Sequence, residues 1–188
     1  GIQGSLKADW RAGAGAVGAI PGAFRDVRRP KRPELPLRVA LQQRWRCAAL
    51  HDAAMYGQID ACRCLLENGA NSNIIGTDNN TPLHKAMFAA DHCKISKILI
   101  EFGADINAIN KYRQSPLHQA AQGGKTDTVM LLLENGADPN IIDEFGDTPL
   151  TNAKLRNSED TVNVLIEYGA KGPNGTDDSE EMRTISKN

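Results

Sequence analysis

Ser115-Pro116-Leu117-His118 is the stretch that decides the fold, because the rest of the chain repeats around it. Thr81-Pro82-Leu83-His84 has the same pattern, and Thr148-Pro149-Leu150-Thr151 keeps all but the last residue. One period earlier, Ala48-Ala49-Leu50-His51 keeps the Leu and the His. These stretches are spaced by 33 or 34 residues, and self-similarity at a fixed period of this size indicates a repeat solenoid.

A second sequence motif recurs with the same spacing and marks where each unit ends. It consists of Leu or Ile, Glu, a variable residue, Gly and Ala, and it occupies residues 66–70, 100–104, 133–137 and 166–170. Thr or Ser before Pro predicts a helix start, because the hydroxyl caps free backbone N–H groups and Pro fits the first helical position. The Gly of this second motif predicts a helix end, where φ is usually positive.

Each unit is therefore predicted to contain two short helices joined by a turn. Leu117, Ala120 and Ala121 form an apolar face on the first helix of one unit, and residues 129–133 supply the second helix. A single unit of this kind cannot bury its apolar face, whereas stacked units share a core. The outer units depart from the pattern, as capping units do, and we assign four in all: residues 47–76, 77–109, 110–142 and 143–172.

On these motifs the chain resembles the ankyrin-repeat family over about two thirds of its length. The resemblance implies an all-α solenoid of stacked helix-turn-helix units with protruding β-turn or hairpin loops. The second unit departs from the family pattern by one extra residue around 90–92, so we expect a bulged turn there. Arg113 stands where the family usually has a loop Gly, so we expect that turn to be strained.

The segments outside the repeats differ in charge from the repeats themselves. Residues 1–46 hold ten Lys or Arg and three Asp or Glu, whereas the rest of the chain holds twelve and twenty. We expect the Gly-, Ala-, Pro- and Arg-rich residues 1–46 and the acidic residues 173–188 to be disordered. The basic cluster at 28–33 fits either a nuclear-localisation signal or a solvated tail, and Trp45 is expected to cap the first repeat.

The four Cys residues show no spacing typical of a disulfide framework, which favours a reducing intracellular compartment, the cytoplasm or the nucleus. Cys62 and Cys64 align with repeat positions that hold Val elsewhere, so we expect both to be small core residues. The alternative is a metal site joining them to His92 and Cys93, but a Cys-x-Cys pair inside a helix points its side chains far apart. We therefore expect no metal and no cofactor.

His51, His84 and His118 recur at one repeat position and so form a ladder. The ankyrin resemblance implies that such a His hydrogen-bonds the backbone and the Thr hydroxyl, which braces neighbouring loops. A hydrolase or metal enzyme built on the ladder is the rival hypothesis. The motif places no nucleophile or acid beside each His, and Thr151 replaces the His in the fourth unit, so we expect no enzymatic activity.

The resemblance also implies a binding surface, because ankyrin solenoids bind other proteins through their loop tips and the outer face of their first helices. Regular packing does not need aromatic residues there, and binding anchors are enriched in them. The expected tip residues are Thr77, Asp78, Asn80, Lys111, Tyr112, Gln114, Glu144, Phe145 and Asp147. The expected helix residues are Met55, Tyr56, Phe88, Ala89, Gln122, Leu155 and Arg156.

These features predict a non-enzymatic protein-binding module that acts as a monomer, like the small adaptor or inhibitor members of the family. Asp78, Glu144 and Asp147 outnumber Lys111 and Arg156 in the groove, which argues against a nucleic-acid partner and favours a basic or mixed peptide or domain. No apolar run approaches the length needed to span a bilayer, so we expect no membrane partner. The alternative is a substrate-recruiting or scaffolding fragment of a larger protein, which the absence of an initial Met favours.

Three asparagines, Asn73, Asn107 and Asn140, close the Gly-Ala-x-x-Asn loops. Such positions in ankyrin proteins resemble substrates of an intracellular asparaginyl hydroxylase. Asn140, which follows Asp138-Pro139, is the preferred candidate. Hydroxylation adds one oxygen to the side chain, which intact mass spectrometry detects.

Overall fold

A computed structural model describes residues 48–172 of the chain, which form paired helices. The first helix covers residues 48–55, and the others are α2 Ile59–Glu67, α3 Pro82–Ala86, α4 His92–Glu101, α5 Pro116–Gln122, α6 Thr126–Glu134, α7 Pro149–Leu155 and α8 Glu159–Glu167. A 3₁₀ turn, η1, covers Thr77–Asn79, and no strand occurs within residues 48–172. The expected all-α repeat fold is confirmed. The predictions made for residues 1–46, with Trp45, and for residues 173–188 lie outside the described residues.

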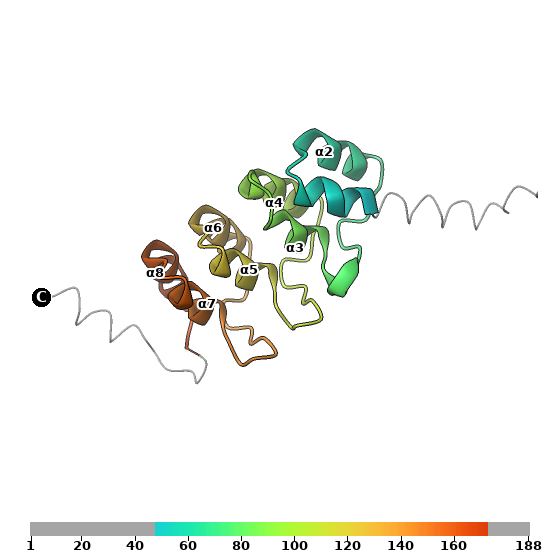
Figure 1. Cartoon of the computed structure of the whole chain (residues 1–188). Helices are drawn as coiled ribbons and strands as arrows, with labels where there is room; N and C mark the ends of the chain where they lie inside the picture. Colours follow the sequence, from blue (N-terminus) through green and yellow to red (C-terminus); the bar gives the residue numbers. More distant parts are fainter. Residues whose placement is uncertain (1–47, 173–188) are drawn as a thin grey trace, which may run out of the picture. The chain divides into compact units, whose positions relative to one another are not determined.

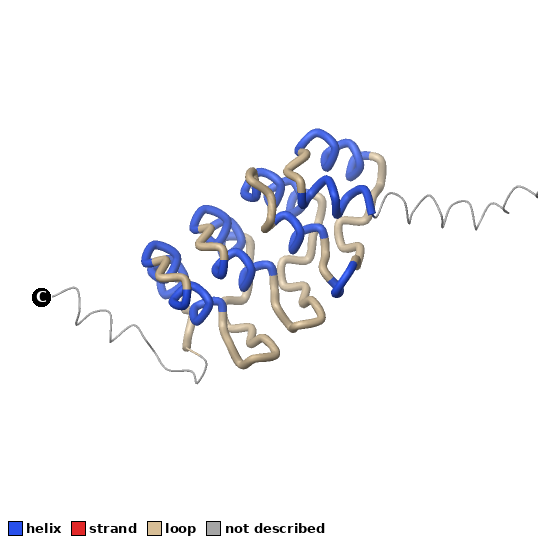
Figure 2. The backbone as a smooth tube through the Cα atoms, viewed as in Figure 1, coloured by secondary structure: helices blue, strands red, loops and turns tan. Residues whose placement is uncertain are grey.

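The helices form two layers that run along the row of repeats (Figure 1). The helix of residues 48–55 and α3, α5 and α7 make the first layer, and α2, α4, α6 and α8 make the second layer. Helices α3 to α8 each pack against the other helix of the same repeat and against the equivalent helix of a neighbouring repeat. The loops between repeats project beyond the first layer (Figure 2), so the loop tips and the first layer together bound one surface, which we call the concave surface.

The Thr-Pro and Ser-Pro stretches start first-layer helices by satisfying free backbone groups. In α3, the Thr81 hydroxyl accepts the backbone N–H of His84, and the His84 ring accepts the backbone N–H of Thr81. Ser115 and His118 form the same capping box at α5. Because a helix start leaves N–H groups without intrahelical partners, these reciprocal bonds place the first turn at the motif.

Glycines end the second-layer helices, as the recurring Gly-Ala motif predicts. Gly69, Gly103, Gly136 and Gly169 have φ of 80°, 76°, 89° and 80°. The N–H of the following Ala then donates to a carbonyl five residues earlier, as the Ala137 N–H does to the Leu132 carbonyl at 2.9 Å. This geometry satisfies carbonyls that the helix end would leave free, and Gly adopts it at little steric cost.

Both expected departures from the repeat pattern appear in the structure. The turn between α3 and α4 covers residues 87–91, whereas the corresponding turns of the next repeats cover only 123–125 and 156–158. Arg113 has φ of 58° at the position where the fourth repeat has Gly146 with φ of 86°. A residue with a Cβ is strained in this left-handed region, so the turn of the third repeat carries the expected strain.

The core lies between the two layers and continues from repeat to repeat. One repeat position places fully buried leucines in the first layer, and another places small residues that let neighbouring helices approach closely. The leucines are Leu50, Leu83, Leu117 and Leu150, and the small residues are Ala53, Ala86, Ala120 and Ala153. Within residues 48–172 no helix has the length and apolar character to cross a bilayer.

The prediction that Cys64 belongs to the core is wrong. Cys62 is buried, and this burial raises the pKa of its thiol to about 11, but Cys64 is exposed. Two residues apart on an α-helix means about 200° apart around its axis, so the two thiols cannot both face inward. Cys62 and Leu66, one turn apart on α2, form the buried face instead.

Candidate protein-binding surface

The loop tips of neighbouring repeats are joined by backbone hydrogen bonds. The N–H of Lys111 donates to the carbonyl of Asp78 at 2.9 Å, and the N–H of Glu144 donates to the carbonyl of Tyr112 at 3.0 Å. The Lys111 ammonium also pairs with the Asp78 carboxylate at 2.6 Å and lies 4.8 Å from the centre of the Tyr112 ring. The tips therefore form one edge of the concave surface, which brings together Thr77, Asp78, Lys111, Tyr112, Glu144 and Phe145.

Polar side chains hold the second and third loops in their conformation. The Asn110 Oδ1 atom accepts the backbone N–H groups of Tyr112 and Gln114 at 2.9 and 3.0 Å. Asp143 does the same in the third loop. The first loop has Gly76 at this position, and its tip folds into the 3₁₀ turn η1 instead.

Two residues expected on the concave surface are buried, and both predictions are wrong. Asn80 is 7% exposed, because its amide donates to the Thr77 carbonyl at 3.1 Å and its side-chain oxygen accepts from Asn110 Nδ2 at 3.2 Å. Turning Asn80 outward would break this link between consecutive loops. Ala89 is 3% exposed and is part of the scaffold.

Large apolar side chains of the first layer and the loop tips are exposed to solvent. Tyr56, Phe88 and Leu155 are 69%, 65% and 73% exposed, and Phe145 is 74% exposed, so packing against neighbouring repeats does not account for them. Tyr112 is 36% exposed. Of the other predicted residues, Thr77, Lys111, Gln122, Glu144 and Arg156 are exposed, whereas Met55, Asp78, Gln114 and Asp147 are half-buried.

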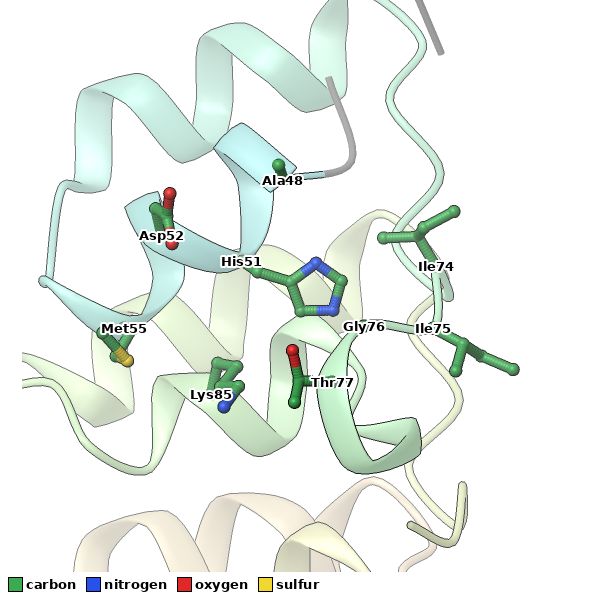
Figure 3. Close-up of a pocket in the computed structure, with 9 residues that line it drawn as sticks. All are labelled: Ala48, His51, Asp52, Met55, Ile74, Ile75, Gly76, Thr77 and Lys85. Carbon is green, nitrogen blue, oxygen red and sulfur yellow. The ribbon is translucent and has the colours of Figure 1, made fainter. Parts of the chain in front are cut away.

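The first hollow on this surface lies between the first two repeats (Figure 3). It has a volume of about 460 Å³ and is lined by Ala48, His51, Asp52, Met55, Ile74, Ile75, Gly76, Thr77 and Lys85. A Cβ on Gly76 would lie 2.8 Å from Nε2 of His51. A side chain at this position would force the His51 ring or the loop to shift, whereas the next two loops have Asn110 and Asp143 here.

The second hollow lies along α5 and α7. It has a volume of about 600 Å³ and is lined by Met87, Phe88, Gln114, Gln119, Gln122, Gly123, Lys125, Asn152, Leu155 and Arg156. The Arg156 side chain reaches the neighbouring repeat, where its Nε donates to the Gln122 carbonyl at 2.7 Å. This hollow brings five predicted residues together, and the first hollow holds Met55 and Thr77.

Comparison of the repeats missed several residues that line the hollows. One set shares a repeat position three residues before the Met55 position, so it lies on the same face of each first-layer helix. Extending the predicted row by one helical turn would have found this set: Asp52, Lys85, Gln119 and Asn152. Lys125 precedes α6 and joins the second hollow through tertiary packing, so no sequence signal points to it.

The histidines of the ladder brace the loops. His84 Nε2 donates to the Gln114 carbonyl at 2.9 Å, and His118 Nε2 donates to the Asp147 carbonyl at 3.2 Å. Since Nδ1 of each ring accepts a backbone N–H, both rings are neutral. Burial lowers the pKa of His84 to about 4 and also lowers the pKa of His118. Within residues 48–172 no group of three or more His, Cys, Asp or Glu side chains could hold a metal ion.

The three loop-closing asparagines link each repeat to the next. The side-chain amides of Asn73, Asn107 and Asn140 donate to the carbonyls of the glycines that end the following second-layer helices, at 2.9, 3.1 and 3.3 Å. Their side-chain oxygens accept backbone N–H groups two residues beyond those glycines, at 2.6, 2.9 and 2.8 Å. All three residues are exposed and therefore combine a structural role with access to solvent.

Comparison with known families agrees with this architecture. A family model described as ankyrin repeats (3 copies) matches residues 35–110 and 87–177, and these ranges include all the described helices. A search of curated proteins found no match to the chain. The matched ranges cover well over half of the sequence, and the chain therefore belongs to the ankyrin-repeat family.

Proposed function

We propose that this chain is a non-enzymatic module that binds a segment of another protein across its concave surface. Ankyrin repeats are generally protein-interaction modules. The observation that carries the proposal is the exposure of Tyr56, Phe88, Phe145 and Leu155, of which Phe88 and Leu155 line the second hollow. Removing such apolar surface from water on binding contributes about 25 cal/mol per Å².

The histidine ladder supports a binding role rather than a catalytic one. Ankyrin-repeat proteins are typically not enzymes. In His84 and His118 both ring nitrogens already take part in hydrogen bonds that hold the loops, which leaves neither ring positioned to accept a proton from a substrate. A recruiting or scaffolding role within a larger protein, the alternative function, would use the same concave surface.

Quantitative affinity capture with a pair of matched variants tests this proposal. Phe88→Ala/Phe145→Ala removes two exposed aromatic rings from the concave surface. Phe102→Ala/Tyr168→Ala removes two rings that are 37% and 41% exposed at the ends of α4 and α8 in the second layer, outside both hollows. We expect the wild-type chain and the second variant to retain the same partner, and the first variant to lose it.

Two outcomes would contradict the proposal. Equal capture by all three proteins would place the interface outside the concave surface, and loss with the second variant alone would place it on the second layer. Circular dichroism of each variant separates loss of the site from loss of the fold.

We also propose that the loop-closing asparagines are sites of asparaginyl hydroxylation in an intracellular compartment, with Asn140 preferred. Their exposure supports access to an enzyme, although the hydrogen bonds to the next repeat must open for the side chain to enter an active site. Intact mass spectrometry of protein from native cells measures the added oxygen. An unmodified mass, together with no modification of Asn73, Asn107 or Asn140 by a purified hydroxylase, would exclude this proposal.

A further inference from the structure

The second hollow carries positive charge beside apolar walls. Lys125 and Arg156 line it, and none of its ten lining residues is Asp or Glu. Partial burial lowers the pKa of Lys125, because the ammonium has lost part of its hydration. Phe88 and Leu155 form largely exposed apolar walls of the same hollow.

Two polar atoms of this lining lack hydrogen-bond partners. Asn152 is only 6% exposed, and its Nδ2 donor is unpaired; the Oε1 acceptor of Gln119 is likewise buried and unpaired. Folded proteins pair nearly all their buried polar groups. Both atoms are closed to solvent, so the Asn152 and Gln119 side chains must turn toward the hollow before a ligand can satisfy them. One donor and one acceptor on the neighbouring helices α7 and α5 match the carbonyl and the N–H of an extended peptide.

The positive charge is particular to the second hollow. At the repeat position of Gln119 and Asn152, the first hollow has Asp52 and Lys85. The charges of these two residues are opposite to each other and offset one another. The loop tips carry Glu144, and their Lys111 is already paired with an acidic residue. An anionic group is therefore attracted to the second hollow more strongly than to the rest of the concave surface.

We infer that the second hollow binds an extended peptide segment of a partner protein, with an Asp or Glu side chain next to a large apolar one. The carboxylate lies between Lys125 and Arg156, the apolar side chain contacts Phe88 or Leu155, and a peptide group pairs with the two unpaired atoms. The inference rests on the proposed function and narrows it. It differs from the basic or mixed peptide expected from the sequence, because the sequence does not place Lys125 on this surface.

Selection of a random peptide library on the full chain tests the preference directly. We expect enrichment of Asp or Glu adjacent to Leu, Ile, Phe or Met. Lys125→Glu/Arg156→Glu should reverse the preference toward Lys and Arg. The matched control, Arg63→Glu/Lys97→Glu, makes the same change in net charge at exposed positions of α2 and α4 and should leave the preference unchanged.

The outcomes of this selection separate the inference from the proposed function. Enrichment of basic or uncharged peptides overturns the acidic preference but leaves concave-surface binding intact. No enrichment of any peptide contradicts both. Binding of a labelled single-stranded oligonucleotide that competes with the selected peptide would assign the two cations to a nucleic acid instead and overturn the inference.

Affinity measurements with the best selected peptide test the individual groups. Lys125→Gln/Arg156→Gln should weaken binding about tenfold or more, and rising salt should weaken wild-type binding, because the attraction is between charges. An affinity insensitive to both changes would overturn the assignment of the carboxylate.

Substitutions of Asn152 distinguish a role in peptide binding from a role in stability alone. Asn152→Leu removes an unpaired buried donor, so the melting temperature should stay the same or rise while peptide affinity falls about tenfold. Asn152→Ala removes the same donor without added bulk and should weaken binding equally. Unchanged affinity in both folded variants would show that the unpaired atoms do not contact the peptide.

Discussion

On the first-layer helices, the interior position of Leu50 is Leu in all four repeats, whereas the concave position of Met55 becomes Phe88, Gln122 and Leu155 in the next three. The leucines are fully buried, but Phe88 and Leu155 are largely exposed. Each repeat packs against a copy of itself, so stacking requires the same interior shape every time. Packing within residues 48–172 places little constraint on the concave position.

Stability and the proposed recognition therefore depend on opposite faces of the same helices. Substitutions in the interior should change the free energy of unfolding without altering peptide preference directly. Substitutions on the concave surface should alter peptide preference and leave the free energy of unfolding nearly unchanged.

The largest effect is expected in the interior, at Leu132. Its side chain is fully buried on α6, so Leu132→Ala should lower the free energy of unfolding by about 2–5 kcal/mol, through lost burial and the cavity left behind. Urea denaturation followed by circular dichroism measures the change. A loss below about 1 kcal/mol would mean that Leu132 is not part of a tightly packed core.

Acidification should destabilise the interior through the neutral histidines. An unfolded chain protonates His84 near its ordinary pKa of 6.5, but burial lowers the folded-state pKa to about 4, so the unfolded state binds more protons between these values. Stability is therefore fully present above about pH 6.5 and falls as the pH drops toward 4, with His84 contributing about 2 kcal/mol of loss by pH 5. His118 acts in the same direction.

Unfolding in urea at a series of pH values checks this prediction. The His84→Gln variant is the control, because it removes the titrating ring and should reduce the slope of stability against pH over this range. Equal slopes for the two proteins would mean that His84 does not contribute to the acid sensitivity.

A smaller effect is expected at the loop tips, where the third and fourth repeats differ. Arg113→Gly should raise the free energy of unfolding by about 0.5–1 kcal/mol, since it relieves a positive φ at some cost in chain entropy. Gly146→Arg should lower it by about 1 kcal/mol or more, through backbone strain alone, because a Cβ there meets no atom within 4 Å. Thermal unfolding of both variants compares the two loops. Changes of the same sign would show that side-chain contacts, and not φ, govern these turns.

The smallest effect on stability is expected on the concave surface itself. Tyr56→Ser should change the free energy of unfolding by less than about 0.5 kcal/mol, because the ring is 69% exposed. The same urea assay used for Leu132→Ala measures it. A loss comparable with that of Leu132→Ala would place Tyr56 in the packing of the first repeat and remove it from the binding surface.

Parts of the candidate site could be predicted because aligning the four repeats with one another shows which residues share a position on the first-layer helices and loops. Phe88, Phe145 and Leu155 were expected on the surface from their repeat positions, and the structure exposes all three. Asn80 was misplaced because its amide bonds to the next repeat, a contact that position within one repeat does not reveal. Cys64 is exposed because the helical period separates it from the buried Cys62, which its alignment with Val positions does not reveal.

By itself, the sequence determined the period, the helix starts and the helix ends of this protein, because these depend on short-range interactions. A Thr-Pro cap or a glycine in the left-handed region acts within a few residues of itself. Only the tertiary structure decided which polar groups were left unpaired and where the charges gathered. Asn152 lies in α7, Gln119 in α5 and Lys125 in the turn before α6, and they meet in one hollow only because adjacent repeats stack.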